Sequence, residues 1–217
     1  MRRFFFLAIG LLTWQAGAAQ KMRDVFAAMP DSLLEIMTRN NRLDCIDFIE
    51  HDMEARVRNR FDGFTSLRAM TLDYLDLQLT ERCRVEMKLL PAEDSLNYIC
   101  MVRTYAGPAR ESTVTLYTPE WQRVPQEEWL RQGPDYADFW KTGSDPAGEA
   151  EIARLQHLQD MRFVTASLQP DDMRLTFALQ PGEVTREDSL EMEKILRPLT
   201  YEWDGRHFVP VKTNDRE

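Results

Sequence analysis

The amino-acid sequence predicts an α+β fold in which antiparallel sheets carry a helical cover. Helix signals occupy the segment before residue 55, and apolar and polar side chains then alternate with a period of two from about residue 75. A similar hairpin pattern returns near the C-terminus together with another helix. We therefore expect sheets built from hairpins, with two related lobes if the returning pattern is an internal repeat.

Two helices are expected near the start of the chain. Pro30-Asp31-Ser32 is typical of a capped helix start, and apolar residues follow it at Leu33, Leu34, Ile36 and Met37. A second helix is predicted from about Leu43 to Met53. Its apolar stripe has the spacing of one helix face and consists of Leu43, Ile46, Ile49 and Met53. The Asp62-Gly63 pair then indicates a turn.

The strands follow this turn. Alternation predicts half-buried antiparallel strands whose inward residues are Leu75, Leu77 and Leu79, then Cys83, Val85, Met87 and Leu89. A turn at Pro91 to Asp94 leads to the next inward set, formed by Leu96, Tyr98, Cys100 and Val102. Two shorter strands are expected at Ser112 to Tyr117 and Trp121 to Val124. The pattern is that of a meander.

The chain also resembles itself at a shift of 79 residues. Without a gap, Val85, Leu89, Pro91 and Tyr98 fall on Val164, Leu168, Pro170 and Phe177. The second copy adds a helix from about Arg186 to Leu196, capped by Thr185 with Asp188. A real repeat predicts two lobes, 20–125 and 149–217, with 126–148 joining them, and it predicts that the hairpins superpose. The alternative is that two hairpins share common turn chemistry.

The N-terminus has the pattern of a secretory signal peptide over residues 1–19. Arg2 and Arg3 precede the apolar run Phe4 to Leu12, and small residues follow near Ala19. A membrane anchor is the alternative, but the apolar run is shorter than the roughly 20 residues that a spanning helix needs. We therefore expect a periplasmic or secreted protein without a membrane span in its mature chain.

Charge argues against two classes of partner. The formal net charge is −9, and loss of Arg2 and Arg3 with the signal lowers it to −11. Phosphate backbones and anionic lipid surfaces are bound by clustered Lys and Arg, and no basic stripe is visible along the sequence. We expect no nucleic-acid partner.

Cys45, Cys83 and Cys100 raise the question of a disulfide, since an oxidising compartment favours pairing. A turn centred between Ala92 and Glu93 places Cys83 opposite Val102, which makes the two strand cysteines diagonal neighbours about 7–8 Å apart. A bridge requires Cα atoms within about 7 Å. We therefore expect free, buried thiols and no disulfide, although a register change of two residues brings the pair directly opposite.

Several segments together resemble the family called domain of unknown function 3256. They are the segments Phe26 to Leu34, Leu43 to Phe48, Gly63 to Leu67 and Glu86 to Pro91. The resemblance covers essentially the whole mature chain. It implies a small exported bacterial protein without an assigned activity, and it supplies no functional residues.

Two groups of residues are candidate sites. Asp44, Asp47 and His51 fall on one face of the second predicted helix, where they could hold a metal ion, act as an acid and base pair, or form a solvated surface. The joining region contains Trp129, Tyr136 and Trp140, which could bind a ligand if exposed or pack the lobes together if buried.

Motifs for nucleophilic catalysis are missing from the sequence. It contains no Gly-x-Ser-x-Gly elbow, no phosphate-binding glycine loop and no His-Glu-x-x-His helix. We expect no cofactor and no metal. The sequence therefore favours a non-catalytic binding or accessory module of the bacterial envelope, with an envelope protein or a glycan as partner. The alternative is a periplasmic hydrolase that uses carboxylates and a histidine.

Overall fold

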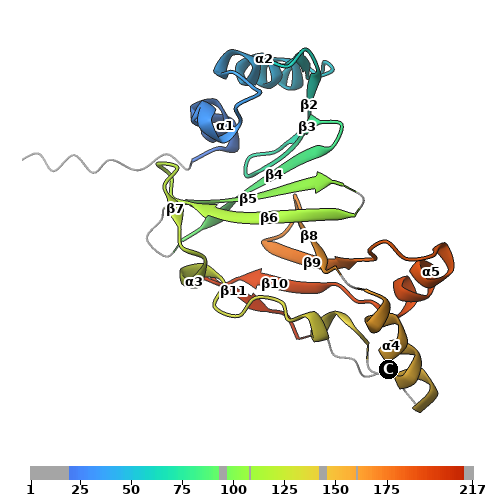
Figure 1. Ribbon diagram of the computed structural model, residues 1–217. Coiled ribbons are helices and arrows are strands. Elements are labelled where there is room, and N and C mark those ends of the chain that lie inside the picture. Colours follow the sequence, from blue (N-terminus) through green and yellow to red (C-terminus); the bar gives the residue numbers. More distant parts are fainter. Residues whose placement is uncertain (1–19, 93–96, 108, 142–145, 160, 213–217) are drawn as a thin grey trace, which may run out of the picture.

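The chain folds into two antiparallel sheets that share a core. A computed structural model describes residues 20–92, 97–107, 109–141, 146–159 and 161–212 (Figure 1). The first sheet has seven strands in the order β1 to β7, and the second has four in the order β11-β10-β9-β8. Helices α1 and α2 lie at the β1–β4 end of the first sheet, and the second sheet lies beside β5 and β6 (Figure 1). The predicted α+β class is confirmed.

The first sheet is a meander in sequence order. Its strands are β1 (Arg56–Arg58), β2 (Phe64–Met70), β3 (Tyr74–Thr80), β4 (Cys83–Pro91), β5 (Asn97–Ala106), β6 (Arg110–Tyr117) and β7 (Arg123–Val124). The second sheet consists of β8 (Phe163–Leu168), β9 (Arg174–Gln180), β10 (Leu199–Trp203) and β11 (Phe208–Pro210). The helices are α1 (Met22–Ala28), α2 (Arg39–Glu50), α3 (Gln126–Trp129), α4 (Pro146–Leu158) and α5 (Arg186–Ile195), with short 3₁₀ segments η1 (Asp31–Leu33) and η2 (Tyr136–Phe139).

The N-terminal helices differ from the sequence prediction. Pro30 begins only the 3₁₀ turn η1, and α2 starts earlier than predicted because Thr38 and Asn41 form a capping box. The buried residues of α2 are Arg42, Cys45 and Ile46. Leu43 and Met53, which were predicted to belong to the apolar stripe, are 37% and 49% exposed. The helix thus packs on a face rotated from the predicted one.

At the other end of the chain, α5 begins where the sequence predicts. Thr185 accepts a hydrogen bond from the backbone amide of Asp188, which caps the helix as expected. The joining region contains more structure than predicted, because α3, η2 and the first part of α4 all lie in it. Among the described residues, no helix is long and apolar enough to cross a membrane.

The first sheet is buried on both faces along β4 and β5. One face packs against α1 and α2 and includes Leu75, Val85, Met87, Ile99 and Met101. The other packs against the second sheet and includes Leu90, Cys100, Val102 and Leu116. Burial on both faces explains why β4 is apolar along almost its whole length.

The register of the β4–β5 hairpin corrects the predicted strand pairing. Cys83 lies opposite Tyr105, and Cys100 lies opposite Lys88, so the observed register is displaced from the predicted one by three residues. An odd displacement changes which residues of β5 share a face with β4. Cys83 consequently joins the helix-side core, while Cys100 joins the core between the sheets.

All three cysteines are free and buried. Cys83 and Cys100 belong to cores on opposite sides of one sheet. The predicted diagonal arrangement placed both side chains on the same side, so the observed arrangement is even less compatible with a disulfide between them. Burial raises the pKa of the Cys45 thiol to about 11, and burial also raises the pKa of Cys83 and of Cys100. These thiols are therefore protonated and poorly nucleophilic at neutral pH.

The two hairpins of the predicted repeat do not have the same register. Leu168 lies opposite Leu175 in the second sheet, whereas its predicted counterpart Leu89 lies opposite Ile99 in the first. A gapless equivalence requires Leu89 to lie opposite Leu96. Phe177 is buried as predicted, but Tyr98 is only half-buried. The hairpins therefore do not superpose residue by residue.

Candidate functional site

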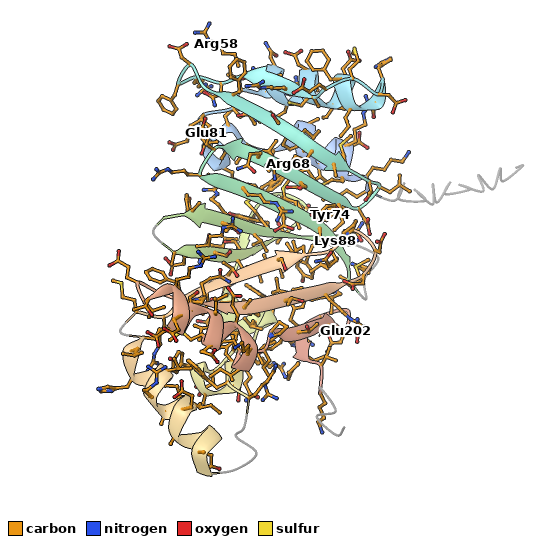
Figure 2. All side chains as sticks on the ribbon, turned by 90° about the vertical axis from the view of Figure 1, so that its right-hand side faces the viewer. Arg58, Arg68, Tyr74, Glu81, Lys88 and Glu202 are labelled. Atoms are coloured by element: carbon orange, nitrogen blue, oxygen red, sulfur yellow. The ribbon has the colours of Figure 1, made fainter. Side chains whose placement is uncertain are left out.

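A polar cleft opens where the first sheet meets β8 and β9. It has a volume of about 480 Å³, and we call it the arginine cleft after the four cations that line it, Arg68, Arg82, Arg84 and Arg110. Figure 2 looks toward this side of the chain, with Arg68 and Glu81 labelled on the first sheet. The far wall is formed by neutral residues of the second sheet, namely Thr165, Ala166, Ser167 and Gln180.

Three of the arginines, Arg68, Arg82 and Arg110, lie at places where the regular strand pairing is interrupted, turns or begins. Arg68 lies at a register irregularity between Leu67 and Ala69 in β2, which re-aims a side chain in the way that bulges do. Arg82 lies in the tight β3–β4 turn, whose backbone is held by a 2.8 Å hydrogen bond from the Ala106 amide to the Arg82 carbonyl. Arg110 begins β6.

Among the residues that the structure describes, three of the four guanidinium groups are not neutralised by an ion pair. Within the described parts of the chain, Arg68, Arg82 and Arg110 make no salt bridge. Glu81 is the acidic residue of the lining. The cleft is therefore a concentration of positive charge on a chain with a net charge of −9.

Arg84 differs from the other three because it is anchored. Its guanidinium contacts Asp76 at 2.8 Å and Glu86 at 3.2 Å, and the hydrogen bond to Asp76 raises the pKa of Arg84. Arg84 thus joins the cleft to a buried polar network beneath it.

Glu86 is the centre of that network. Its Oε1 accepts a 3.1 Å hydrogen bond from the Tyr74 hydroxyl, while Oε2 has no hydrogen-bond partner of good geometry. Burial raises the pKa of Glu86, and Arg84 and the Tyr74 hydroxyl oppose this effect. Burial also raises the pKa of Tyr74. Asp76 and Glu86 hold the Arg84 guanidinium in place from the buried side, and the part of Arg84 that lines the cleft stays accessible to a ligand.

Lys88 connects the same region to the second sheet. Its buried ammonium contacts Asp73 at 2.9 Å and donates to the Pro170 carbonyl at 2.6 Å. Ser112 on β6 donates to the Ala166 carbonyl at 3.5 Å. These side chains occupy backbone acceptors of β8, which is an edge of its own sheet, and of the turn that follows it. They hold the far wall of the cleft against the first sheet.

A second pocket adjoins the arginine cleft. It has a volume of about 700 Å³, and we call it the phenylalanine pocket because Phe61 and Phe64 are the exposed aromatic residues in its lining. The arginine cleft and the phenylalanine pocket form one groove, because they share the lining residues Gln78, Glu81 and Arg82. Arg56 lies over the Phe64 ring at 4.0 Å from its centre.

The sequence-predicted acid and base candidates lie elsewhere. Asp44, Asp47 and His51 are exposed on α2. The His51 ring contacts the Asp47 backbone carbonyl at 2.8 Å and its carboxylate at 3.4 Å, and these contacts raise the pKa of His51. In the described ranges, no group of three His, Cys, Asp or Glu side chains is arranged to hold a metal ion.

The aromatic candidates of the joining region belong to the core. Trp129 and Trp140 are buried, and Tyr136 is half-buried. Trp129 packs edge-on against Phe208 at 6.2 Å between ring centres, and Tyr136 packs against Trp140 at 5.8 Å. These residues are buried or half-buried, as the packing alternative requires, and they fix the joining region onto the second sheet.

The comparisons with known proteins agree with the fold. A solved structure of a domain of an uncharacterized protein from Porphyromonas gingivalis W83 is similar, with a TM-score of 0.71 and 23% identity over 90% of this chain and 100% of that chain. This likeness concerns the fold alone. No curated protein matches the chain. Residues 14–208 match the family described as Protein of unknown function (DUF3256). The chain therefore belongs to the DUF3256 family.

Proposed function

We propose that the chain is a non-catalytic binding module of the bacterial envelope that holds an anionic ligand in the arginine cleft. The observation that carries this proposal is the set of three arginines without an ion pair around one cleft of the described chain. Guanidinium groups bind carboxylates and phosphates through paired hydrogen bonds. An acidic chain has many carboxylates available to neutralise arginines, so unpaired ones in a cleft favour an external anion.

The chemistry of the lining supports binding in preference to catalysis. Apart from Ala106 and Ala166, the neutral residues around the arginines carry hydroxyl or amide groups, which orient a ligand through hydrogen bonds. Several already have partners: Gln180 donates to Thr165, and Thr104 shares a hydrogen bond with Ser112. A histidine or cysteine is absent from the described lining of the cleft. This composition favours recognition of a polar anion.

The envelope location is the second part of the proposal, and it is supported by the signal-like residues 1–19, which lie outside the described residues. Mass spectrometry of protein purified from the native envelope is expected to find a mature N-terminus at Ala19 or Gln20, because both frames leave small residues where the peptidase reads. Retention of the Phe4 to Leu12 segment would instead identify a membrane anchor.

The anion site is tested by removing the three unpaired arginines together. We expect calorimetric titration at low salt to detect binding of citrate or pyrophosphate by the wild-type protein. The triple variant Arg68→Ala, Arg82→Ala, Arg110→Ala is expected to bind about 100-fold more weakly, from roughly 1 kcal/mol for each charged hydrogen bond. Binding should also weaken as salt is added.

Arg186→Ala is the matched control, because Arg186 is an exposed arginine on α5 outside the cleft lining. It should bind like the wild type. The three cleft residues are themselves exposed, so their removal should leave the circular dichroism spectrum unchanged. Equal anion binding by the triple variant and the control, or no anion binding by the wild type, would contradict the proposal.

A further inference from the structure

We propose that the groove formed by the arginine cleft and the phenylalanine pocket binds an acidic oligosaccharide in an extended conformation, lying across the strands. This inference rests on the proposed anion-binding function and names the class of its ligand. The carboxylates of the sugar chain contact the arginines, and a sugar ring packs on the phenylalanines. Three observations carry it. They are a row of polar residues across the sheet, two exposed aromatic rings, and strands whose backbones are already hydrogen-bonded to a neighbouring strand on each side.

The first observation is a straight row of polar side chains along the groove. Register pairs Arg56 with Ser66, Ser66 with Gln78, Gln78 with Arg84, and Arg84 with Thr104. Directly paired residues project from the same face of a sheet. We call this set the polar row: Arg56, Ser66, Gln78, Arg84 and Thr104. It supplies one polar side chain from each of β1 to β5, and every member lines one or both pockets.

The spacing of the polar row matches a repeating polar ligand. Neighbouring strands lie about 4.8 Å apart, so the four steps from Arg56 to Thr104 span roughly 19 Å. One sugar unit extends a 1,4-linked glycan by a length similar to the spacing between two neighbouring strands. About four units would therefore span the row, one for each step between neighbouring strands.

The second observation is that two phenylalanine rings are displayed to solvent beside this row. Phe61 is 76% exposed and Phe64 is 53% exposed. The turn that contains Phe61 and precedes Phe64 is well defined, because the Asn59 side chain accepts hydrogen bonds from the amides of Phe61 and Gly63 at 3.0 and 3.1 Å. Exposed aromatic rings held in a fixed position can pack against the apolar face of a pyranose with little loss of entropy.

The third observation distinguishes a glycan from a peptide or a lipid. Along the polar row, the backbones of β2, β3, β4 and β5 are each paired on both sides, so most of the groove offers side chains, and only β1 and β8 at its borders are edge strands. A peptide that adds to a sheet requires such an edge. An acyl chain requires apolar walls, whereas arginine, serine, glutamine and threonine side chains line this groove beside the phenylalanines, together with Glu54 and Glu81. Hydroxyl-rich, carboxylate-bearing sugars satisfy these donors.

The experiment is calorimetric titration of the purified protein with oligogalacturonates of one to six units. Affinity is expected to rise at least about 30-fold from one unit to four, then to level off because the row is filled. Neutral maltooligosaccharides of the same lengths should bind at least about 30-fold more weakly than the acidic series, since the arginines lack their partners. Penta-glutamate tests the peptide alternative and should bind no better than the single sugar.

The variant Phe61→Ala, Phe64→Ala separates the two proposals. It should lose about tenfold in affinity for the four-unit sugar and keep its affinity for one unit, while the control Leu72→Ala, an exposed apolar residue outside both linings, should change neither. If citrate and single sugars bind but length and the phenylalanines have no effect, the glycan inference fails and the anion site stands. Tight binding of penta-glutamate would also overturn it.

Discussion

Replacing Trp203 with alanine is expected to lower the free energy of unfolding by about 4 kcal/mol. Its indole ring is buried and packs against Tyr98 of the first sheet at 6.0 Å and against Phe208 at 5.2 Å between ring centres. Its Nε1 also donates a 2.7 Å hydrogen bond to the Pro91 carbonyl, across 112 residues of sequence. Alanine therefore removes both a core side chain and a direct link between the sheets.

Urea unfolding monitored by circular dichroism measures this loss. Trp203→Phe is the informative companion, because it keeps an aromatic ring and removes the indole donor, and it should cost about 1–2 kcal/mol. An alanine variant within about 1 kcal/mol of the wild type would show that the two sheets are held together without this residue.

Replacing Arg42 with alanine is expected to cost about 3 kcal/mol of unfolding free energy. The Arg42 side chain is only 1% exposed, and it contacts Asp31 at 2.9 Å. It also donates to the backbone carbonyls of Met37 and Met29. Removing the guanidinium leaves these acceptors without their donor and opens a cavity under α2.

Arg60→Ala is the matched control for Arg42. Arg60 contacts the same carboxylate of Asp31 at 3.5 Å but is half exposed, so its loss should cost less than about 1 kcal/mol. Denaturant midpoints of the two variants give the comparison. Equal destabilisation by both changes would mean that burial of Arg42 contributes nothing beyond its ion pair.

Arg42 also explains where the sequence prediction of α2 went wrong. Apolar periodicity selected Leu43 and Met53 as buried residues, but the helix buries the stem of an arginine in their place. A long charged side chain can occupy a core position when its charge has fixed partners. Periodicity counts only apolar residues, so it misses such a position. The Thr38–Asn41 capping box was the local signal for the true start.

Strand positions were predictable, and strand register was not. Alternation located β3, β4 and β5, and the Thr185 cap located α5, within a few residues of their observed bounds. Because β4 is buried on both faces, however, alternation could not decide which side of β5 faces the helices. The length of the β4–β5 connection determines that, and it changed the pairing by an odd number of residues.

The arginine cleft was beyond sequence reasoning for a different reason. Its cations come from β2, the β3–β4 turn, β4 and β6, so no basic stripe exists along the chain. Only cross-strand pairing brings Arg56 and Arg84 into one row. The signal available in the sequence was that Gln78 and Arg84 occupy polar positions of alternating segments. A face of that kind is ordinarily read as solvated surface.

The sequential order of the first sheet has a consequence for how the chain acquires its structure as it folds. Each of its strands pairs with its neighbours in sequence, so residues 56–124 contain every partner they need and can form by successive local steps. The second sheet is built from residues later in the chain. Until it docks, the face that carries Leu90, Val102 and Leu116 remains in water, and this partly folded form is exposed to aggregation.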